Sequence, residues 1–391
     1  MPCGDTNPGL LAEDVRRRTL RIAGITSFDF HRVLDGRSWN PAWRWRERRV
    51  PLVCIVTDDG ICGIGEGWSL DNDTAPFHVH LAKVAPALLG EDAGAIATIH
   101  ARLWSEAGWA DAAVASAIDV ALWDARARAQ GVKLCALIGA ASRPVPVYAS
   151  GGLYADGQTL PELADAFRGY VAQGFRAVKL KIGAHGRKDD LARVAAVRAA
   201  VGPDVPIIVD ALGCLPPGDA VLWLPPLAAF GVTAIQAPLP STDIAGLASL
   251  QAHGPLAVIA GEAEFRHAVL HDLMRQHAVS LLQICICLCG GITGALRLAA
   301  LARECGIGIT PQCHGTAVLQ AASLHLGTGC DTVTTVEYHM FHAHLHAVLP
   351  DSMQHPIDGC MQLGAQPGLG IDAAALFANI DGTLHTITTI A

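Results

Sequence analysis

Residues 177–211 read AVKLKIGAHGRKDDLARVAAVRAAVGPDVPIIVDA, in which two short β-rich runs flank an alanine-rich helical stretch. The same alternation extends from about residue 145 to about residue 338. The β-rich runs occupy residues 145–150, 177–182, 206–211, 234–238, 256–262, 281–286, 306–312 and 332–338. Strands that alternate with helices form parallel sheets, and eight such units predict an α/β fold with a (β/α)8-type (TIM-like) barrel. A doubly wound open sheet is the alternative, but no Gly-x-Gly-x-x-Gly motif follows the first run.

A different pattern precedes the barrel. Residues 21–33, 49–57 and 61–68 read as strands of an antiparallel sheet, and the Asp-Asp-Gly sequence at 58–60 is a hairpin signal between the last two. Residues 112–130 place apolar side chains at helical spacing. These patterns predict a small N-terminal α+β domain.

Composition narrows the class of protein. The chain has 391 residues, 51% of them hydrophobic, so it exceeds a typical domain of about 150 residues and can bury a large core. Residues 1–18 contain no apolar signal segment, and no later stretch has 18 consecutive uncharged apolar residues. We therefore expect a soluble cytoplasmic protein with no membrane partner. The twelve cysteines follow no regular framework, which predicts reduced thiols. A net charge of −8 argues against a nucleic-acid partner.

Polar residues end the predicted barrel strands, which is where the active sites of such barrels lie. The barrel would gather them around one mouth. They are Lys179, Lys181, Asp210, Gln236, Glu262, Cys285, Gln312 and Glu337. Lys179 and Lys181 share one face of their strand, so we expect mutual repulsion to lower the pKa of each.

Several strings along the chain resemble those of one family. They are VTDDGICGIGEGW (56–68), ASAIDVALWDARARAQG (115–131), VKLKIG (178–183), VDA (209–211), GE (261–262), GGITGALRLAALA (290–302), TP-x-x-x-GTAV (310–318) and PGLGID (367–372). In this order they are similar to the mandelate racemase and muconate lactonizing enzyme-like branch of the enolase superfamily. The resemblance implies an N-terminal capping domain over residues 1–142, a catalytic barrel over 143–350 and a segment, 351–391, that returns to the capping domain.

The resemblance also implies a chemistry. Such enzymes abstract a proton next to a carboxylate and stabilise the resulting enediolate with Mg²⁺. In this sequence Lys181 would be the base, and Lys179 would help to neutralise the substrate carboxylate. The implied metal ligands are Asp210, Gln236 and Glu262. The family has glutamate where Gln236 stands, so either magnesium binds with one negative charge fewer, or the metal is lost and Gln236 binds substrate.

The resemblance assigns Glu337 a hydrogen bond to the substrate carboxylate, but other positions depart from the family. Gln312 replaces the histidine of the racemases. Cys285 replaces the aspartate that supports that histidine, or the lysine of the cycloisomerases. His314, two residues beyond Gln312, is a candidate substitute acid, although the alignment of Gly315 and Thr316 argues against it.

Three further clusters have two interpretations each. Cys285, Cys287 and Cys289, with Cys214 and Cys313 near them, either bind zinc or fill the core, and we favour the core. The histidines at 339, 342, 344 and 346 either face the site or form a solvated loop, and we favour the loop. Residues 35–49, rich in arginine and tryptophan, either close the barrel mouth over an anionic, multiply carboxylated substrate or form a surface hairpin. The arginines of this segment are Arg37, Arg44, Arg46, Arg48 and Arg49.

These residues favour a dehydratase-like lyase, in which Lys181 removes a proton alpha to the carboxylate of a hydroxy or sugar acid and a beta substituent leaves. One-sided base chemistry suits elimination. A racemase, epimerase or cycloisomerase that uses His314 or Cys285 is the alternative enzyme. A non-catalytic carboxylate-binding homologue and a metal-independent lyase are two further alternatives. The expected partner is a small carboxylate, and the resemblance implies a homo-oligomer.

Overall fold

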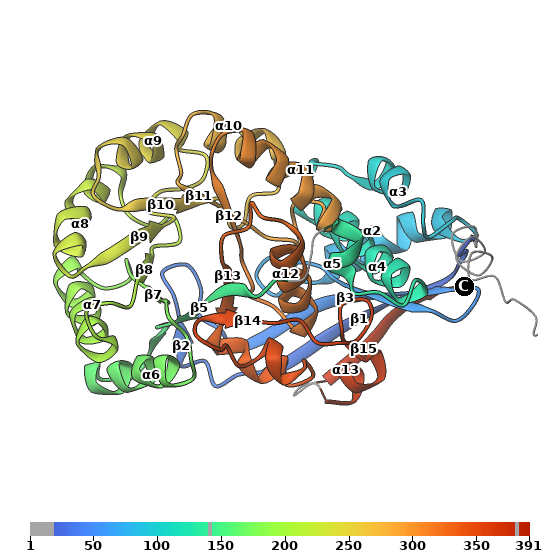
Figure 1. Cartoon of the computed structure of the whole chain (residues 1–391), viewed down its shortest axis with the longest axis horizontal. Helices are drawn as coiled ribbons and strands as arrows, with labels where there is room; N and C mark the ends of the chain where they lie inside the picture. Colours follow the sequence, from blue (N-terminus) through green and yellow to red (C-terminus); the bar gives the residue numbers. More distant parts are fainter. Residues whose placement is uncertain (1–18, 140–142, 380–382) are drawn as a thin grey trace, which may run out of the picture.

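A computed structural model describes residues 19–139, 143–379 and 383–391 (Figure 1). Its larger part is a parallel sheet in the order β12-β11-β10-β9-β8-β7-β5-β13. The strands are β5 (Val145–Gly151), β7 (Val178–Lys181), β8 (Ile207–Asp210), β9 (Val232–Gln236), β10 (Ala257–Ala260), β11 (Leu281–Ile284), β12 (Gly308–Pro311) and β13 (Val336–His339). A parallel bridge between Ile309 and Val333 brings the segment before β13 against β12, so the sheet is nearly closed. The predicted barrel is confirmed.

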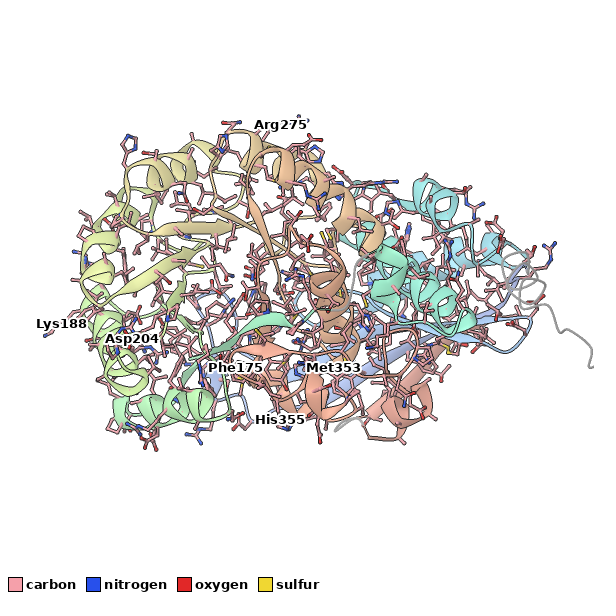
Figure 2. All side chains as sticks on the ribbon, viewed as in Figure 1. Phe175, Lys188, Asp204, Arg275, Met353 and His355 are labelled. Atoms are coloured by element: carbon pink, nitrogen blue, oxygen red, sulfur yellow. A yellow bond between two sulfur atoms is a disulfide. The ribbon has the colours of Figure 1, made fainter. Side chains whose placement is uncertain are left out.

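Helices follow the barrel strands and cover the sheet on its outside (Figure 1). They are α6 (Leu160–Ala172), α7 (Arg187–Val201), α8 (Pro217–Ala229), α9 (Ile244–His253), α10 (His267–Arg275), α11 (Gly291–Glu304) and α12 (Ala317–Gly329). Figure 2 shows the consequence for the side chains: Lys188 and Arg275 lie on the outer rim, whereas Phe175 is buried inside. The carboxyl ends of the strands therefore remain free to carry a site.

The N-terminal domain is an antiparallel sheet packed against helices. Its strands, in the order β15-β1-β3-β4, are β15 (Thr383–Ile390), β1 (Ile22–Val33), β3 (Glu47–Thr57) and β4 (Cys62–Glu66). Its helices are α2 (Ala75–Val84), α3 (Ile96–Leu103), α4 (Trp109–Ala129) and α5 (Leu134–Ile138), with a 3-10 turn, η1 (Ala85–Leu88). Because β15 pairs with β1, the end of the chain lies in this sheet. The predicted capping domain is present, and its exact bounds stay a prediction.

Two glycines let β4 pack directly on α4. A Cβ at Gly63 would lie 2.0 Å from the carbonyl oxygen of Ala121, and one at Gly65 would lie 1.9 Å from that of Ala117. Real side chains do not approach backbone this closely, so only glycine permits the contact. The glycines at 63 and 65 of the GICGIGEG string are therefore explained by helix–sheet packing.

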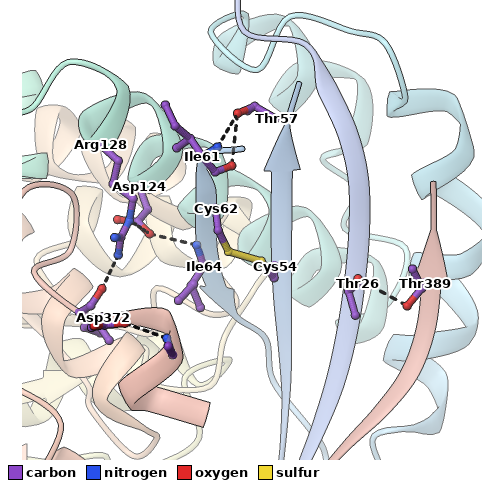
Figure 3. Close-up of a disulfide and its surroundings, with 12 residues drawn as sticks. Thr26, Cys54, Thr57, Ile61, Cys62, Ile64, Asp124, Arg128, Asp372 and Thr389 are labelled. Carbon is purple, nitrogen blue, oxygen red and sulfur yellow. Dashed lines mark hydrogen bonds and ion pairs between the residues drawn. A yellow bond between two sulfur atoms is a disulfide. The ribbon is translucent and has the colours of Figure 1, made fainter. Parts of the chain in front are cut away.

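Cys54 of β3 and Cys62 of β4 form a disulfide with their Cα atoms 6.3 Å apart (Figure 3). The expectation of reduced thiols throughout is wrong at this pair. The reason lies in the hairpin: Cys54 pairs with Ile64 and Val56 pairs with Cys62, so the two cysteines are diagonal neighbours on one face of the sheet. That separation lies within the range a disulfide spans.

Glu66, at the end of β4, joins the two domains. Its buried carboxylate accepts hydrogen bonds from the Thr316 N–H at 3.1 Å, the Thr316 hydroxyl at 2.5 Å and the Leu319 N–H at 3.1 Å. These donors belong to the first turn of α12, where a carboxylate is favourable. A Cβ at Gly315 would lie 2.1 Å from Glu66 Oε1. The loop between β12 and α12 is therefore fixed by the capping domain.

The remaining elements are short. They are β2 (Ser38–Trp39), which pairs with β6 (Tyr154–Ala155), the 3-10 turns η2 (Met340–His346) and η3 (Asp351–Met353), β14 (Cys360–Met361) and α13 (Ala373–Asn379). Within the three described ranges, no helix combines the length and apolarity needed to cross a membrane. The predicted absence of a signal segment concerns residues 1–18, which lie outside these ranges.

Candidate active site

A pocket of about 540 Å³ lies where the barrel strands end, and capping-domain residues form part of its wall. The barrel contributes Lys181, Glu262, Gln312, His314 and His339 to its lining. The segment between β2 and β3 contributes Asn40, Ala42, Trp43, Arg44 and Trp45, and the start of β3 contributes Arg48. Of the two interpretations of the arginine-rich segment, the structure supports the one in which it covers the barrel mouth.

Lys179 is buried at the centre of a charged cluster. Its Nζ lies 2.7 Å from Gln236 Oε1, 2.7 Å from Glu337 Oε1 and 3.3 Å from Asp210 Oδ2. Burial alone would lower the pKa of Lys179, but Glu337, Tyr148 and Asp210 together hold it well above its ordinary value. The predicted lowering by mutual repulsion is therefore wrong for Lys179, because the nearby acidic groups outweigh the second lysine.

Lys181 lies on the same face of β7 and lines the pocket, where it is 4% exposed. Its Nζ donates a hydrogen bond to Asp210 Oδ2 at 2.5 Å. The register explains the contact, because Lys181 and Asp210 are paired residues of the adjacent strands β7 and β8. Of the two lysines, Lys181 is the one that a ligand in the pocket can reach.

The three carboxylates of the cluster differ in their pKa. Burial would raise the pKa of Asp210, but Lys181 and Lys179 hold it below its usual value. For Glu337, burial is again outweighed, chiefly by Lys179, and the pKa falls to about 2. Burial and the neighbouring Asp210 raise the pKa of Glu262 to about 7. Glu262 is therefore the carboxyl of this cluster that exchanges its proton near neutral pH.

Asp210, Gln236 and Glu262 lie at the ends of adjacent strands. Gln236 pairs in register with Asp210 of β8 and Ile259 of β10, and its Nε2 donates to Glu262 Oε2 at 2.5 Å. All three side chains carry oxygen donors, which is the chemistry that Mg²⁺ prefers, so they fit such an ion. The set contains only two carboxylates, and among the described residues no three His, Cys, Asp or Glu side chains are grouped to hold a metal.

The amide of Gln236 has a defined orientation. An ammonium group only donates hydrogen bonds, so the oxygen of the amide faces Lys179 and its NH₂ faces Glu262. A glutamate here would present an oxygen on both sides. The substitution therefore removes one negative charge and also places a donor beside Glu262.

Gln312 is 1% exposed and lines the pocket, and both polar atoms of its amide lack a hydrogen-bond partner in the described part of the chain. A buried unpaired amide is destabilising unless a ligand or water satisfies it. An amide offers one acceptor and two donor hydrogens, which suits the hydroxyl groups of a ligand.

Cys285 lies outside the pocket lining and is fully buried just after β11. Cys287 and Cys289 are buried with it, and burial raises the pKa of both thiols well above the ordinary value. Cys285, Cys287, Cys289 and Cys313 belong to the hydrophobic core, whereas Cys214 is exposed. The interpretation of the cysteines as core residues is confirmed for these four and wrong for Cys214.

The expectation of a solvated histidine loop is wrong for three of its members. His339, His342 and His346 are buried, because β13 continues to His339 and η2 folds back against β5. His339 follows Glu337 by two residues, so strand alternation places both on one face, and that local signal could have found it. Burial, more than its charged neighbours, lowers the pKa of His339 to about 3.

His314 also lines the pocket, and its ring lies 4.9 Å from that of His339 and 5.6 Å from that of Trp45, centroid to centroid. Burial, followed by the charge of Arg48, lowers the pKa of His314 well below its usual value. The barrel thus gathers Lys179, Lys181, Asp210, Gln236, Glu262 and Glu337 into one cluster. It places Gln312, His314 and His339 in the adjoining wall.

The fold and the pocket define a two-domain protein with an α/β barrel, whose charged site lies beneath a capping domain. The enolase C-terminal domain-like family matches residues 162–375, and the mandelate racemase / muconate lactonizing enzyme N-terminal domain family matches residues 44–139. The chain belongs to the enolase superfamily, in its mandelate racemase and muconate lactonizing enzyme-like branch.

Similar proteins and solved structures support this assignment. The chain is 28% identical to arabinonate dehydratase of Saccharolobus solfataricus, over 92% of this chain and 96% of the relative. It is 30% identical to 3,6-anhydro-alpha-L-galactonate cycloisomerase of Streptomyces coelicolor, over 82% and 87% respectively. The crystal structure of L-talarate dehydratase from Polaromonas sp. JS666, complexed with Mg and L-glucarate, matches with a TM-score of 0.80 at 26% identity, over 94% of this chain and 99% of that chain.

Proposed function

We propose that this chain is a lyase that removes water from a sugar acid, with Lys181 as the base. The observation that carries the proposal is the asymmetry of the pocket. Lys181 reaches the pocket from β7, whereas the two imidazoles of the wall, His314 and His339, have pKa values far below neutral. Gln312 does not exchange protons. Glu262, which also lines the pocket, is assigned to the metal, so Lys181 is the base that remains, and a single base supports elimination over two-base racemisation.

In the proposed reaction the side chains neutralise the substrate carboxylate, remove the alpha proton and protonate the leaving hydroxyl group. Lys179, held by Glu337, contributes fixed positive charge for the substrate carboxylate. The neutral amine of Lys181 takes the proton from the alpha carbon. The bond from the beta carbon to its hydroxyl oxygen then breaks, and the oxygen leaves as water after receiving a proton. Lys181 gives the proton it has taken to this oxygen on the same face of the substrate, so the lysine is neutral again. The enol product then tautomerises to a 2-keto acid, as its hydroxyl proton passes to solvent and the beta carbon takes one up from solvent.

Asp210, Gln236 and Glu262 would hold Mg²⁺, which supplies divalent positive charge next to the developing enediolate. We expect calorimetric titration to show magnesium binding that Asp210→Ala abolishes. Gln236→Glu should tighten binding by about tenfold or more, because it restores a third carboxylate. If the unsubstituted protein binds no magnesium while it dehydrates sugar acids, the metal assignment is wrong and the metal-independent lyase is right.

The proposed reaction is tested with a set of aldonic and aldaric acids in deuterium oxide. We expect one or more of them to give a 2-keto-3-deoxy acid, with deuterium incorporated into the product. Conversion of none of the acids, together with no deuterium exchange at the alpha carbon, would reject dehydration and support the non-catalytic alternative.

An isomerase is the second candidate, because His314 and His339 line the same pocket as Lys181. We expect His314→Asn and His339→Asn each to lower kcat for dehydration less than tenfold, since neither ring carries an exchangeable charge near pH 7. The measurement is product formation together with the epimer content of recovered substrate. An epimer that disappears in either variant would favour the isomerase.

We also propose that the protein is cytoplasmic and forms a homo-oligomer.

A further inference from the structure

The arginines of residues 35–49 differ in their partners. Arg44 pairs with Asp156 at 2.6 Å, and Arg49 pairs with Asp29 and Glu47, each at 3.3 Å. Arg48 is 8% exposed and lines the pocket, yet it forms no ion pair within 4.0 Å with any described carboxylate. It is thus a buried guanidinium at the pocket wall without a paired anion.

The contacts of Arg48 are to neutral acceptors. One terminal nitrogen lies 3.4 Å from Asn72 Oδ1 and 3.2 Å from the carbonyl oxygen of Arg49, and the other lies 3.0 Å from the carbonyl oxygen of His314. The buried Nε has no partner in the described residues. Glu66 contributes a favourable charge interaction from beyond ion-pair distance. Carbonyl and amide oxygens position the guanidinium, but they leave its full charge unneutralised.

Arg48 and the reacting groups of the pocket belong to different domains. Lys181, Asp210 and Glu262 belong to strands or strand ends of the barrel, whereas Arg48 belongs to β3 of the capping domain. A ligand whose first carboxylate lies at the Lys181 end of the pocket would extend past Gln312, whose unpaired amide suits hydroxyl groups, toward the capping-domain wall. A second anionic group at that wall would neutralise Arg48.

We propose that Arg48 binds a second carboxylate, so that the substrate class is a sugar diacid rather than a sugar monoacid. The inference rests on the proposed dehydratase function and deepens it. The planar guanidinium matches a carboxylate with two parallel hydrogen bonds, which a hydroxymethyl group in the same place does not provide. Arg48 therefore acts as a specificity residue.

The test compares galactarate with galactonate, which differ in one terminal group, on the magnesium-loaded full chain. We expect the diacid to be favoured in kcat/KM by roughly 10- to 100-fold, as for a charge-assisted hydrogen-bonded pair. Arg48→Gln should bring the two values within about threefold of each other. Arg48→Lys keeps the positive charge but loses the planar pair of hydrogen-bond donors, so it should retain part of the preference. That result would also show that the site still folds.

Arg49→Gln is the matched control, because Arg49 is the next residue along β3 but lies outside the pocket lining and is already paired with Asp29 and Glu47. It should leave the diacid preference unchanged. Equal use of both acids by the unsubstituted protein, or an unchanged preference in Arg48→Gln, overturns the inference and leaves dehydration standing. Calorimetry distinguishes failure of the diacid site from failure of the dehydratase function. If galactarate binds in a manner that depends on Arg48 but is not dehydrated, the dehydratase function is rejected and the diacid site is retained. Binding of neither acid rejects both.

Discussion

Lys181→Ala should lower kcat for dehydration by roughly 10²- to 10⁴-fold, the contribution typical of a positioned general base. Lys181 is the lysine of the pair that reaches the pocket. His314 and His339 are weak bases, Gln312 is not a base, and Glu262 is assigned to the metal. Exchange of the alpha proton with deuterium oxide should stop in the same variant. A small primary amine added to the solution should restore part of the rate.

Lys188→Ala is the control for this experiment. Lys188 is exposed on the outer rim of α7, directly after the strand that carries Lys181 (Figure 2). Its removal should change neither kcat nor exchange. Circular dichroism of Lys181→Ala checks that Asp210 does not disrupt the barrel once its partner is gone. Unaltered exchange in a folded Lys181→Ala protein would reject Lys181 as the base.

Glu337→Gln should lower the free energy of unfolding of the metal-free protein by about 3 kcal/mol at neutral pH. The carboxylate lies 2.7 Å from Lys179 and both side chains are 1% exposed, so the substitution leaves a buried ammonium without its nearest anion. The magnitude follows from the fall of the Glu337 pKa from 4.5 to about 2, at about 1.4 kcal/mol for each pKa unit. Denaturation by urea measures the difference.

The pH dependence of that difference has a definite sign. The pKa of Glu337 is lower in the folded chain than in the unfolded chain, so its stabilisation is complete above about pH 5 and is lost as the pH falls toward 2. The gap between Glu337→Gln and the unsubstituted protein should shrink over that interval. The double variant Lys179→Met with Glu337→Gln should recover part of the lost stability, because it removes both charges. A gap that is constant down to pH 3, or no recovery, would contradict the ion pair.

The fold was predictable because its signals are local. Each barrel strand is a short β-rich run between helical stretches, and the hairpin between β3 and β4 has its Asp-Asp-Gly turn, in which Gly60 adopts a φ of +83°. The helix at 112–130 appears as α4 (Trp109–Ala129). The disulfide was missed, because cysteine spacing in the sequence does not show that Cys54 and Cys62 are diagonal neighbours across a hairpin.

The candidate site was only partly predictable. Strand-end position correctly indicated that Lys179, Lys181, Asp210 and Glu337 would meet, since the carboxyl ends of parallel strands converge in a barrel. The same criterion also selected Cys285, which the structure places in the hydrophobic core and outside the pocket lining. The catalytic and metal-binding roles of the strand-end residues remain predictions.

The sequence by itself determined the barrel, its family and the types of charged side chain at its mouth, because strand periodicity and motif order depend on neighbouring residues alone. Only the tertiary structure decided the state of those side chains. The pKa of Lys179 is raised, not lowered, because Glu337 from a distant strand packs against it. His339 is buried because η2 folds back against β5. Arg48 lines the pocket without a paired anion, whereas the adjacent Arg49 pairs with Asp29 and Glu47. Charge and burial depend on non-local contacts, and these exist only in the folded chain.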